Sequence, residues 1–251
     1  MLGLSLGITS IIDKPSGFNP STLSGLKVWL DGSDSSSIIH SSGAVSQWSD
    51  KSGNANHFVQ ATSPNQPTTN TRTLNGKNAL NFDGNSDMLS CTNASALAIL
   101  TGQCTVFCVA SRDVLTGDYT LLTSGGAGTG AWGVSNNDTS ANARQTTQWG
   151  VSTLPVTNDL LAHTIGMHTN GATNPSNRVF RDGIFGGTYS DSGSTVTVAT
   201  LINLGAVNTG FGWWDGAIGE VLIFNRALSN TELNNVGNYL KSKWGTLWTN
   251  V

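Results

Sequence analysis

One stretch decides how this chain folds: WWDGAIGEVLIFNRAL, residues 213–228. Alternate residues of an extended chain point to opposite faces, and here both faces receive apolar side chains. We expect one face to carry Ile218, Glu220, Leu222 and Phe224, and the other Gly219, Val221 and Ile223. A strand that is apolar on both faces belongs inside a sandwich, because an edge strand would leave one face in water.

The residues after this strand predict a helix. Ser229 and Glu232 have the spacing of a capping box, in which each residue satisfies a free backbone N–H of the first turn. Apolar residues then recur at helical spacing, at Leu233, Val236, Leu240 and Trp244. Gly245 follows them and predicts where the helix ends.

Strand patterns separated by turn residues fill the rest of the chain, without helical crossovers, which predicts an antiparallel all-β sandwich. The expected strands are residues 27–31, 44–49, 58–61, 79–83, 105–112, 119–124, 131–135, 143–149, 163–169, 178–181, 184–189, 201–206 and 213–224. The expected loops are residues 63–72, 125–130, 135–141 and 171–177, and residues 94–100 could form one helical turn. Asp182 and Gly183 predict a tight hairpin, since both tolerate the positive φ of a primed turn.

Length and charge limit the classes of function. The 251 residues fit one sandwich domain, residues 24–251, after an N-terminal arm, residues 1–23. A net charge of −3 and the lack of a basic run predict no nucleic-acid partner and no membrane partner. No apolar run approaches the roughly 20 residues of a membrane-spanning helix.

The three cysteines predict buried thiols. Cys91, Cys104 and Cys108 are odd in number, and the last two share one face of an expected strand. That spacing does not suit a disulfide framework.

The N-terminal arm is weakly apolar and alternating before a run that contains Pro15, Gly17 and Pro20. It lacks the basic start and the cleavage site of a signal peptide, so we expect no export by that route. We expect a partner chain to hold the arm; the alternative is that it packs on its own sandwich as an added strand. The expected contact residues are Leu2, Leu4, Leu6, Ile8, Ile11 and Ile12.

Four ordered segments resemble laminin G-like domains of the concanavalin A-like lectin and glucanase superfamily. They are GLKVWLD (25–31), VSQWSDKSGN (45–54), ALNFDGNSD (79–87), and WDGAIGEVLIFNRALS (214–229) with TELNNVGNYLKSKWG (231–245). The resemblance implies a jelly-roll β-sandwich with a short C-terminal helix. It identifies a fold better than an activity.

Catalytic residues are scarce. A glycosidase needs two carboxylates across the scissile bond, but the sequence has only two glutamates, Glu220 and Glu232, and the capping box accounts for the second. The Glu-x-Asp-x-x-Glu strand of glucanases in this superfamily has no counterpart. We therefore expect a protein that is not an enzyme, in which Glu220 pairs with an arginine or accepts backbone donors.

Two kinds of binding site are candidates. Asp83 and Asp87 flank an oxygen-rich turn, and the resemblance implies a calcium site there as the one cofactor to consider, with a plain turn as the alternative. Exposed aromatic rings stack on sugar rings, which makes Trp132, Trp149 and Trp214 the candidate ligand-binding residues. Trp29, Trp48 and Trp244 fall on apolar patterns and are expected in the core.

The resemblance extends to surface proteins of phages and bacteria, and free cysteines suit assembly inside a host cell. We therefore expect a bacteriophage virion protein, a capsid decoration, head fibre or tail fibre. Its arm would bind other virion proteins, its sandwich a glycan or host surface, and the chain would be a homo-oligomer. The alternatives are a structural decoration protein without a ligand and a secreted glycan-active enzyme.

Overall fold

The computed structural model describes residues 17–93, 103–117, 119–124, 132–137, 142–147, 150–155, 159–170, 178–187, 201–207 and 212–251. In chain order the elements are η1 (Pro20–Thr22), β1 (Leu26–Asp31), η2 (Ser35–Ser37), β2 (Ile38–Ser41), β3 (Ala44–Trp48), β4 (Phe58–Val59), η3 (Ser63–Asn65), β5 (Thr68–Leu74), β6 (Lys77–Asp83), β7 (Leu89–Cys91), β8 (Gln103–Arg112), β9 (Tyr119–Ser124), β10 (Trp132–Asn137), β11 (Asn142–Thr147), β12 (Gly150–Pro155), β13 (His163–Asn170), β14 (Arg178–Arg181), β15 (Ile184–Phe185), β16 (Ile202–Leu204), β17 (Asp215–Phe224) and α1 (Asn230–Trp244).

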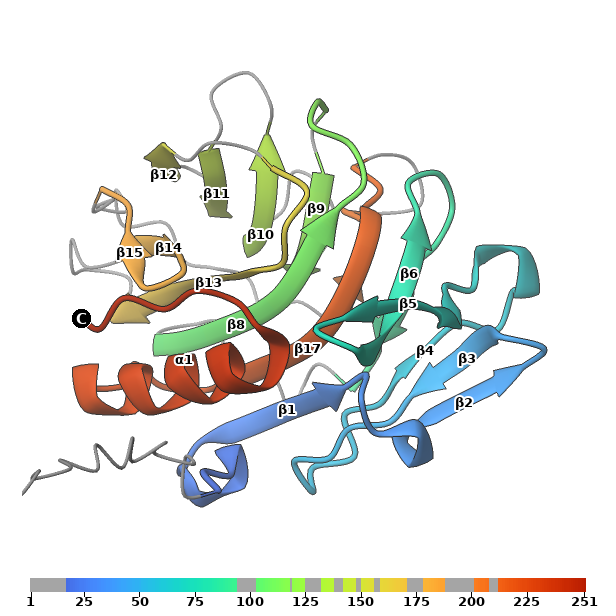
Figure 1. Cartoon of the computed structure of the whole chain (residues 1–251), viewed down its shortest axis with the longest axis horizontal. Helices are drawn as coiled ribbons and strands as arrows, with labels where there is room; N and C mark the ends of the chain where they lie inside the picture. Colours follow the sequence, from blue (N-terminus) through green and yellow to red (C-terminus); the bar gives the residue numbers. More distant parts are fainter. Residues whose placement is uncertain are drawn as a thin grey trace, which may run out of the picture.

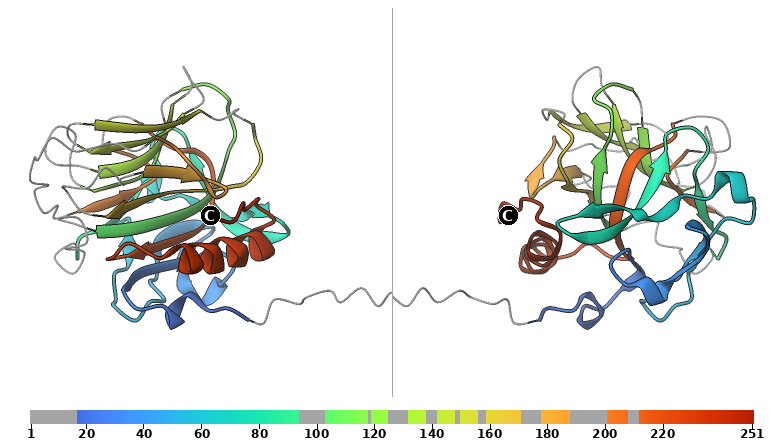
Figure 2. Two further views of the ribbon diagram at one scale, coloured as in Figure 1. Left: turned by 90° about the vertical axis from the view of Figure 1, so that its left-hand side faces the viewer. Right: turned by 45° about the vertical axis from the view of Figure 1, so that its right-hand side comes forward.

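Strand β17 lies at the centre of the molecule, as its sequence predicts. It pairs antiparallel with β1, β6 and β8, and nine of its ten residues are buried. The strands form one curled antiparallel sheet that folds over itself, with α1 packed on its outer side (Figures 1 and 2). The all-β sandwich with a C-terminal helix is thereby confirmed.

The apolar residues gather into two cores, one on each face of β17. The inner core lies between the layers of the curled sheet and includes Trp48, Phe82, Ile218 and Trp214. The outer core lies between the sheet and α1; its aromatic members include Phe107, Phe180, Phe224, Trp244 and Trp248. Burial on both faces explains why β17 has almost no polar residues.

The simple alternation expected along β17 is wrong at one point. The register with β8 shifts between Ile218 and Glu220, which is a β-bulge. Consequently Ile218 joins Val221 and Ile223 in the inner core, rather than sharing a face with Leu222. A Cβ added at Gly219 would lie 3.0 Å from the Trp244 ring, so the residue at the bulge stays small where α1 packs against it.

Helix α1 begins and ends where the sequence predicts. Ser229 and Glu232 form both bonds of the capping box, and Gly245 ends the helix with φ of 72°. The Asp182-Gly183 hairpin is also confirmed, since both residues have positive φ and Arg181 pairs with Ile184.

Several strands were not predicted. The loop expected at residues 63–72 contains β5 from Thr68 onward, because Pro64 and Pro67 precede this threonine-rich strand rather than interrupt it. The short strands β2, β7 and β12 were also missed. The possible helical turn at residues 94–100 lies outside the described residues.

The residues after α1 are fastened to the fold. Trp248 is buried against Gly237 of α1, where an added Cβ would overlap its ring. The amide of Asn234 binds the backbone N–H and carbonyl of Val251, over 2.9 and 3.0 Å. The Thr249 N–H donates to the Asp182 carbonyl over 2.8 Å, which joins this tail to the β14–β15 turn.

The predicted state of the cysteines is confirmed, since Cys91, Cys104 and Cys108 are buried free thiols. No helix in the described ranges is long and apolar enough to cross a membrane. The expected arm contacts, at Leu2, Leu4, Leu6, Ile8, Ile11 and Ile12, lie outside the described residues.

Candidate functional site

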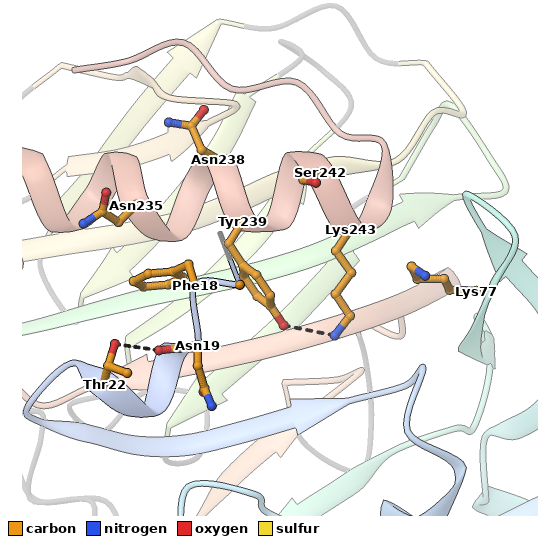
Figure 3. Close-up of a pocket in the computed structure, with 10 residues that line it drawn as sticks. Phe18, Asn19, Thr22, Lys77, Asn235, Asn238, Tyr239, Ser242 and Lys243 are labelled. Carbon is orange, nitrogen blue, oxygen red and sulfur yellow. Dashed lines mark hydrogen bonds between the residues drawn. The ribbon is translucent and has the colours of Figure 1, made fainter. Parts of the chain in front are cut away.

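A pocket of about 860 Å³ lies between α1 and the segment that precedes β1 (Figure 3). One wall is formed by residues 17–22, which contain η1, and the other by one side of α1, with Lys77 of β6 at one end. This volume is within the range of small-ligand sites, about 300–1,000 Å³. The pocket therefore has room for a ligand of one or two sugar rings.

Two aromatic rings provide its apolar surface. The ring centroids of Phe18 and Tyr239 lie 5.9 Å apart with an interplanar angle of 58°. Figure 3 shows the Tyr239 ring between Phe18 and Lys243. Both rings are half-buried, so each leaves part of its surface to the pocket.

Neutral polar groups provide a second part of the lining, beside Lys77 and Lys243. Asn235 and Ser242 are exposed on α1, and their side chains make no hydrogen bond within the described part of the chain. The Asn238 amide nitrogen donates to Asn250 over 3.0 Å, which leaves its carbonyl oxygen as an acceptor. An apolar ring surface beside amide and hydroxyl groups is the combination that binds sugars, which have both C–H faces and hydroxyl groups.

A buried carboxylate holds the floor of the pocket in place. Glu220 Oε1 accepts from Trp29 Nε1 over 2.7 Å and from the Tyr239 hydroxyl over 2.9 Å. Its Oε2 accepts from Trp244 Nε1 over 2.6 Å and pairs with Lys243 Nζ at 2.8 Å. Four donors thus saturate one side chain, and they fix the Tyr239 ring relative to β1 and β17.

This arrangement corrects the expectation for Glu220. Its partners among the described residues are the Lys243 ammonium, the indole N–H groups of Trp29 and Trp244 and the Tyr239 hydroxyl, rather than an arginine or backbone donors. Burial raises the pKa of Glu220, while the charge of Lys243 opposes that shift. Burial and the Glu220 charge also raise the pKa of the Tyr239 phenol, so this hydroxyl stays protonated and donates.

The network continues through Asp31. Lys243 Nζ lies 2.7 Å from Asp31 Oδ1, and Lys51 Nζ lies 2.9 Å from Asp31 Oδ2 and 2.7 Å from Asp34 Oδ2. Burial opposes ionisation of Asp31, but the two lysines and Ser33 hold its pKa below the ordinary value. Asp31 and Glu220 are therefore two carboxylates on one ammonium, and both lie buried behind the pocket surface.

The tryptophans expected to bind a ligand are not brought together at this pocket. Trp214 is fully buried in the inner core, so its expected role as an exposed stacking ring is corrected. Trp132 is the first residue of β10, but its side chain is outside what the structure describes, as is the whole of Trp149. Trp48 and Trp244 are buried as predicted, and Trp29 is half-buried against the outer core.

The Asp83 and Asp87 side chains bind the turn that they flank. Asp83 Oδ1 accepts the N–H groups of Asn85, Ser86 and Asp87 over 2.8–3.0 Å. Asp87 Oδ2 accepts the Asp83 N–H over 2.9 Å. Among the described residues no three His, Cys, Asp or Glu side chains are grouped to hold a metal ion. The bonds from Asp83 and Asp87 given above go to backbone N–H groups of the turn, as Asp side chains commonly do in turns.

A second cluster of charged groups lies under the β14–β15 hairpin. His163 Nδ1 is 2.6 Å from Asp182 Oδ2, and its Nε2 is 2.7 Å from Asp159 Oδ1 and in contact with the Arg181 guanidinium. The cavity beside it has a volume of about 10 Å³, which is enough for one water molecule. These groups therefore fix the hairpin and leave no room for a larger ligand.

The sequence did not single out Phe18, Tyr239 or Lys243. Phe18 belongs to the segment interpreted as an arm, and Tyr239 and Lys243 lie within the predicted helix but outside its apolar positions. The spacing of Tyr239 and Lys243, four residues apart on one helical face, is the signal available in the sequence.

Comparisons with known proteins identify similar folds but do not identify a family. No family model matches the chain, and no curated protein gives a significant match. Similar solved structures include Trypanosoma rangeli sialidase in complex with sialic acid, with a TM-score of 0.60 and 18% identity over 89% of this chain. The same sialidase with a difluorinated sugar, 2,3-difluoro-KDN, has a TM-score of 0.62 and 17% identity.

The binding domain of botulinum neurotoxin DC in complex with SialylT is also similar, with a TM-score of 0.56 and 12% identity over 89% of this chain. The chain spans 34% of the sialidase chain and 55% of the toxin chain. At these identities the likeness establishes a shared curled antiparallel β-sandwich.

The expectation that the chain is not an enzyme is contradicted by these comparisons, because the similar structures include sialidases, which are enzymes. The scarcity of glutamates had supported that expectation by analogy with glucanases. Sialidases are among the glycosidases that depart from the two-carboxylate pattern, so counting glutamates was the wrong criterion.

Proposed function

We propose that this chain is a carbohydrate-binding laminin G-like sandwich on the surface of a bacteriophage particle. It binds a glycan in the pocket between α1 and residues 17–22, and the part of its N-terminal arm before these residues, residues 1–16, attaches it to other virion proteins. The observation that carries the proposal is the pocket itself, in which Phe18 and Tyr239 offer ring surface beside Asn235, Asn238 and Ser242.

The position of Tyr239 supports this site. Its hydroxyl is held by Glu220 over 2.9 Å and by Lys243 over 3.1 Å, so the ring is fixed before a ligand arrives. A fixed ring loses little conformational entropy on binding, which favours affinity. The similar structures hold sialic acid and SialylT, which makes sugars the ligand class to test first.

A glycan array followed by calorimetry tests the binding site. We expect the wild type to bind at least one glycan and Phe18→Ala to weaken that binding about tenfold, because the variant removes one ring from the pocket. Ile39→Ala is the matched control, since Ile39 is an exposed apolar residue of β2 and does not line the pocket. If no glycan binds, or if Phe18→Ala binds as the wild type does, the proposal is wrong.

Deleting residues 2–16 tests the attachment. The deletion leaves Phe18 and its contact with Tyr239 in place, so the sandwich is expected to fold and to keep glycan binding. We expect the truncated protein to be missing from purified particles and the full chain to be incorporated. Incorporation of both proteins to the same extent would show that the arm is not the attachment segment.

A further inference from the structure

The pocket carries one positive charge that no described group neutralises. Among its lining residues are two lysines, Lys77 and Lys243, and no carboxylate. Lys243 is bound by Asp31 Oδ1 at 2.7 Å and by Glu220 Oε2 at 2.8 Å. Lys77 has no hydrogen bond or ion pair from its side chain within the described part of the chain, which leaves its ammonium available to a ligand.

The carboxylates behind the pocket do not cancel this charge. Asp31 and Glu220 are covered, with side-chain exposures of 6% and 0%, and both are paired with Lys243, which lines the pocket while they do not. An anion entering the pocket would therefore meet ammonium groups first. A direct charge-assisted hydrogen bond to Lys77 is stronger than the repulsion from buried, already paired carboxylates farther away.

The arrangement of the lining selects the shape of the ligand. Figure 3 shows Phe18 and Tyr239 toward one end of the pocket and Lys77 at the other, beyond Lys243. A ligand that uses both ends needs an apolar face for the rings and an anionic group for the lysine. Hydroxyl groups along its length would bind Asn238 and Ser242 on α1.

We infer that the pocket prefers an anionic sugar, whose carboxylate or sulfate binds the Lys77 ammonium while its ring lies against Phe18 and Tyr239. This inference rests on the glycan binding proposed above and names the class of glycan. A neutral sugar of the same size fills the same space but leaves Lys77 without a partner. The two sugars have the same shape, so the difference in their affinities comes from the charge.

Matched sugars measure that difference. The probes are a glycoside of N-acetylneuraminic acid, its methyl ester and a sulfated galactoside with its unsulfated parent, titrated by calorimetry. We expect the wild type to bind an acidic member about tenfold more tightly than its neutral partner, with the difference shrinking at high salt. A preference for the sulfated pair alone identifies sulfate as the anion, and a preference for the sialic acid pair identifies the carboxylate.

Lysine variants locate the charge. Lys77→Gln is expected to remove the preference and to keep the affinity for the neutral partner, while Lys77→Arg keeps the preference. Lys241→Gln is the control. Lys241 is an exposed lysine in the last turn of α1, as Lys243 is, but it does not line the pocket. Loss of the preference in Lys241→Gln, or its retention in Lys77→Gln, overturns the inference.

The two proposals fail differently. If the wild type binds neither member of any pair, and the array is also negative, glycan binding itself is wrong. If it binds the acidic and the neutral partner equally well, glycan binding stands and the inference about Lys77 alone is wrong.

Discussion

Lys243 and Glu220 form an ion pair of 2.8 Å between Nζ and Oε2 in which the glutamate side chain is fully buried. The pair joins the last turn of α1 to the bulge of β17, and it lies directly behind the candidate pocket. The position of the pocket wall therefore depends on the Glu220 charge, which is not part of the pocket lining.

Replacing this carboxylate should destabilise the fold. In Glu220→Gln one oxygen becomes an NH₂ group that faces existing donors, either Trp29 and Tyr239 or Trp244 and Lys243. We expect a loss of about 3 kcal/mol in the free energy of unfolding, measured by urea denaturation. Lys241→Gln on the exposed face of α1 is the control, expected within about 0.5 kcal/mol of wild type. A Glu220→Gln variant as stable as this control would contradict the role of the network.

Stability at acid pH should depend on the hydrogen bonds that Glu232 accepts from Arg226 and Ser229. Hydrogen bonds from Arg226 and Ser229 lower the pKa of Glu232 to about 2. Since the folded pKa lies below the ordinary value of 4.5, the stabilisation is complete above pH 4.5 and is lost as the pH falls toward 2. We expect Glu232→Gln to show a smaller loss of stability than the wild type between those pH values. Parallel stability curves for the two proteins would count against this assignment.

Asp87 should have the opposite pH dependence. Burial and the nearby Asp83 raise its pKa to about 7. The folded state therefore holds a proton that the unfolded state releases above its pKa of 3.8, so this contribution to stability declines as the pH rises toward 7.

Asp87→Asn removes this titration, and its amide oxygen still accepts the Asp83 N–H. We expect the melting temperature of the variant to rise relative to that of the wild type as the pH is raised from 5 to 8. A difference that does not change with pH would show that Asp87 does not titrate in this range.

The β14–β15 turn should not accept a side chain at position 183. Gly183 has φ of 82°, and an added Cβ would overlap the Thr249 carbonyl oxygen of the tail. We expect Gly183→Ala to cost about 2 kcal/mol or more in the free energy of unfolding. Gly187→Ala, four residues along, is the matched control because its Cβ meets nothing within 4 Å. Equal stability of the two variants would mean that the tail can move away from the turn.

The thiols should be unreactive in the folded protein. Burial raises the pKa of Cys104 to about 11 and that of Cys108 to about 12, and it also raises the pKa of Cys91. We expect a disulfide-exchange reagent to release almost no chromophore from native protein at pH 8, and three equivalents after denaturation. Rapid reaction of one native thiol would show that its strand opens locally.

Local signals in the sequence were enough to predict parts of the fold. The capping box at Ser229 and Glu232 identifies the start of α1, and the Asp182-Gly183 pair identifies the hairpin, because each is decided by neighbouring backbone groups. The bulge at Gly219 was not predictable in this way. It depends on packing against Trp244, which comes from a different element.

The candidate site was largely beyond the reach of sequence patterns. Trp29 and Glu220 stand 191 positions apart and form a 2.7 Å hydrogen bond only because β1 pairs with β17. Trp214 shows the converse problem. Alternation allowed either ring of the Trp213-Trp214 pair to face outward, and burial in the inner core was decided by the sheet curling over it.

The contacts that hold the residues after α1 against that helix determine what a label at residue 251 would measure. Asn234 holds both backbone polar groups of Val251, and Trp248 is packed against Gly237. A fluorophore joined there by a short linker would rotate with the whole sandwich rather than independently of it. Its fluorescence anisotropy would therefore report whether the protein is alone or part of a larger particle.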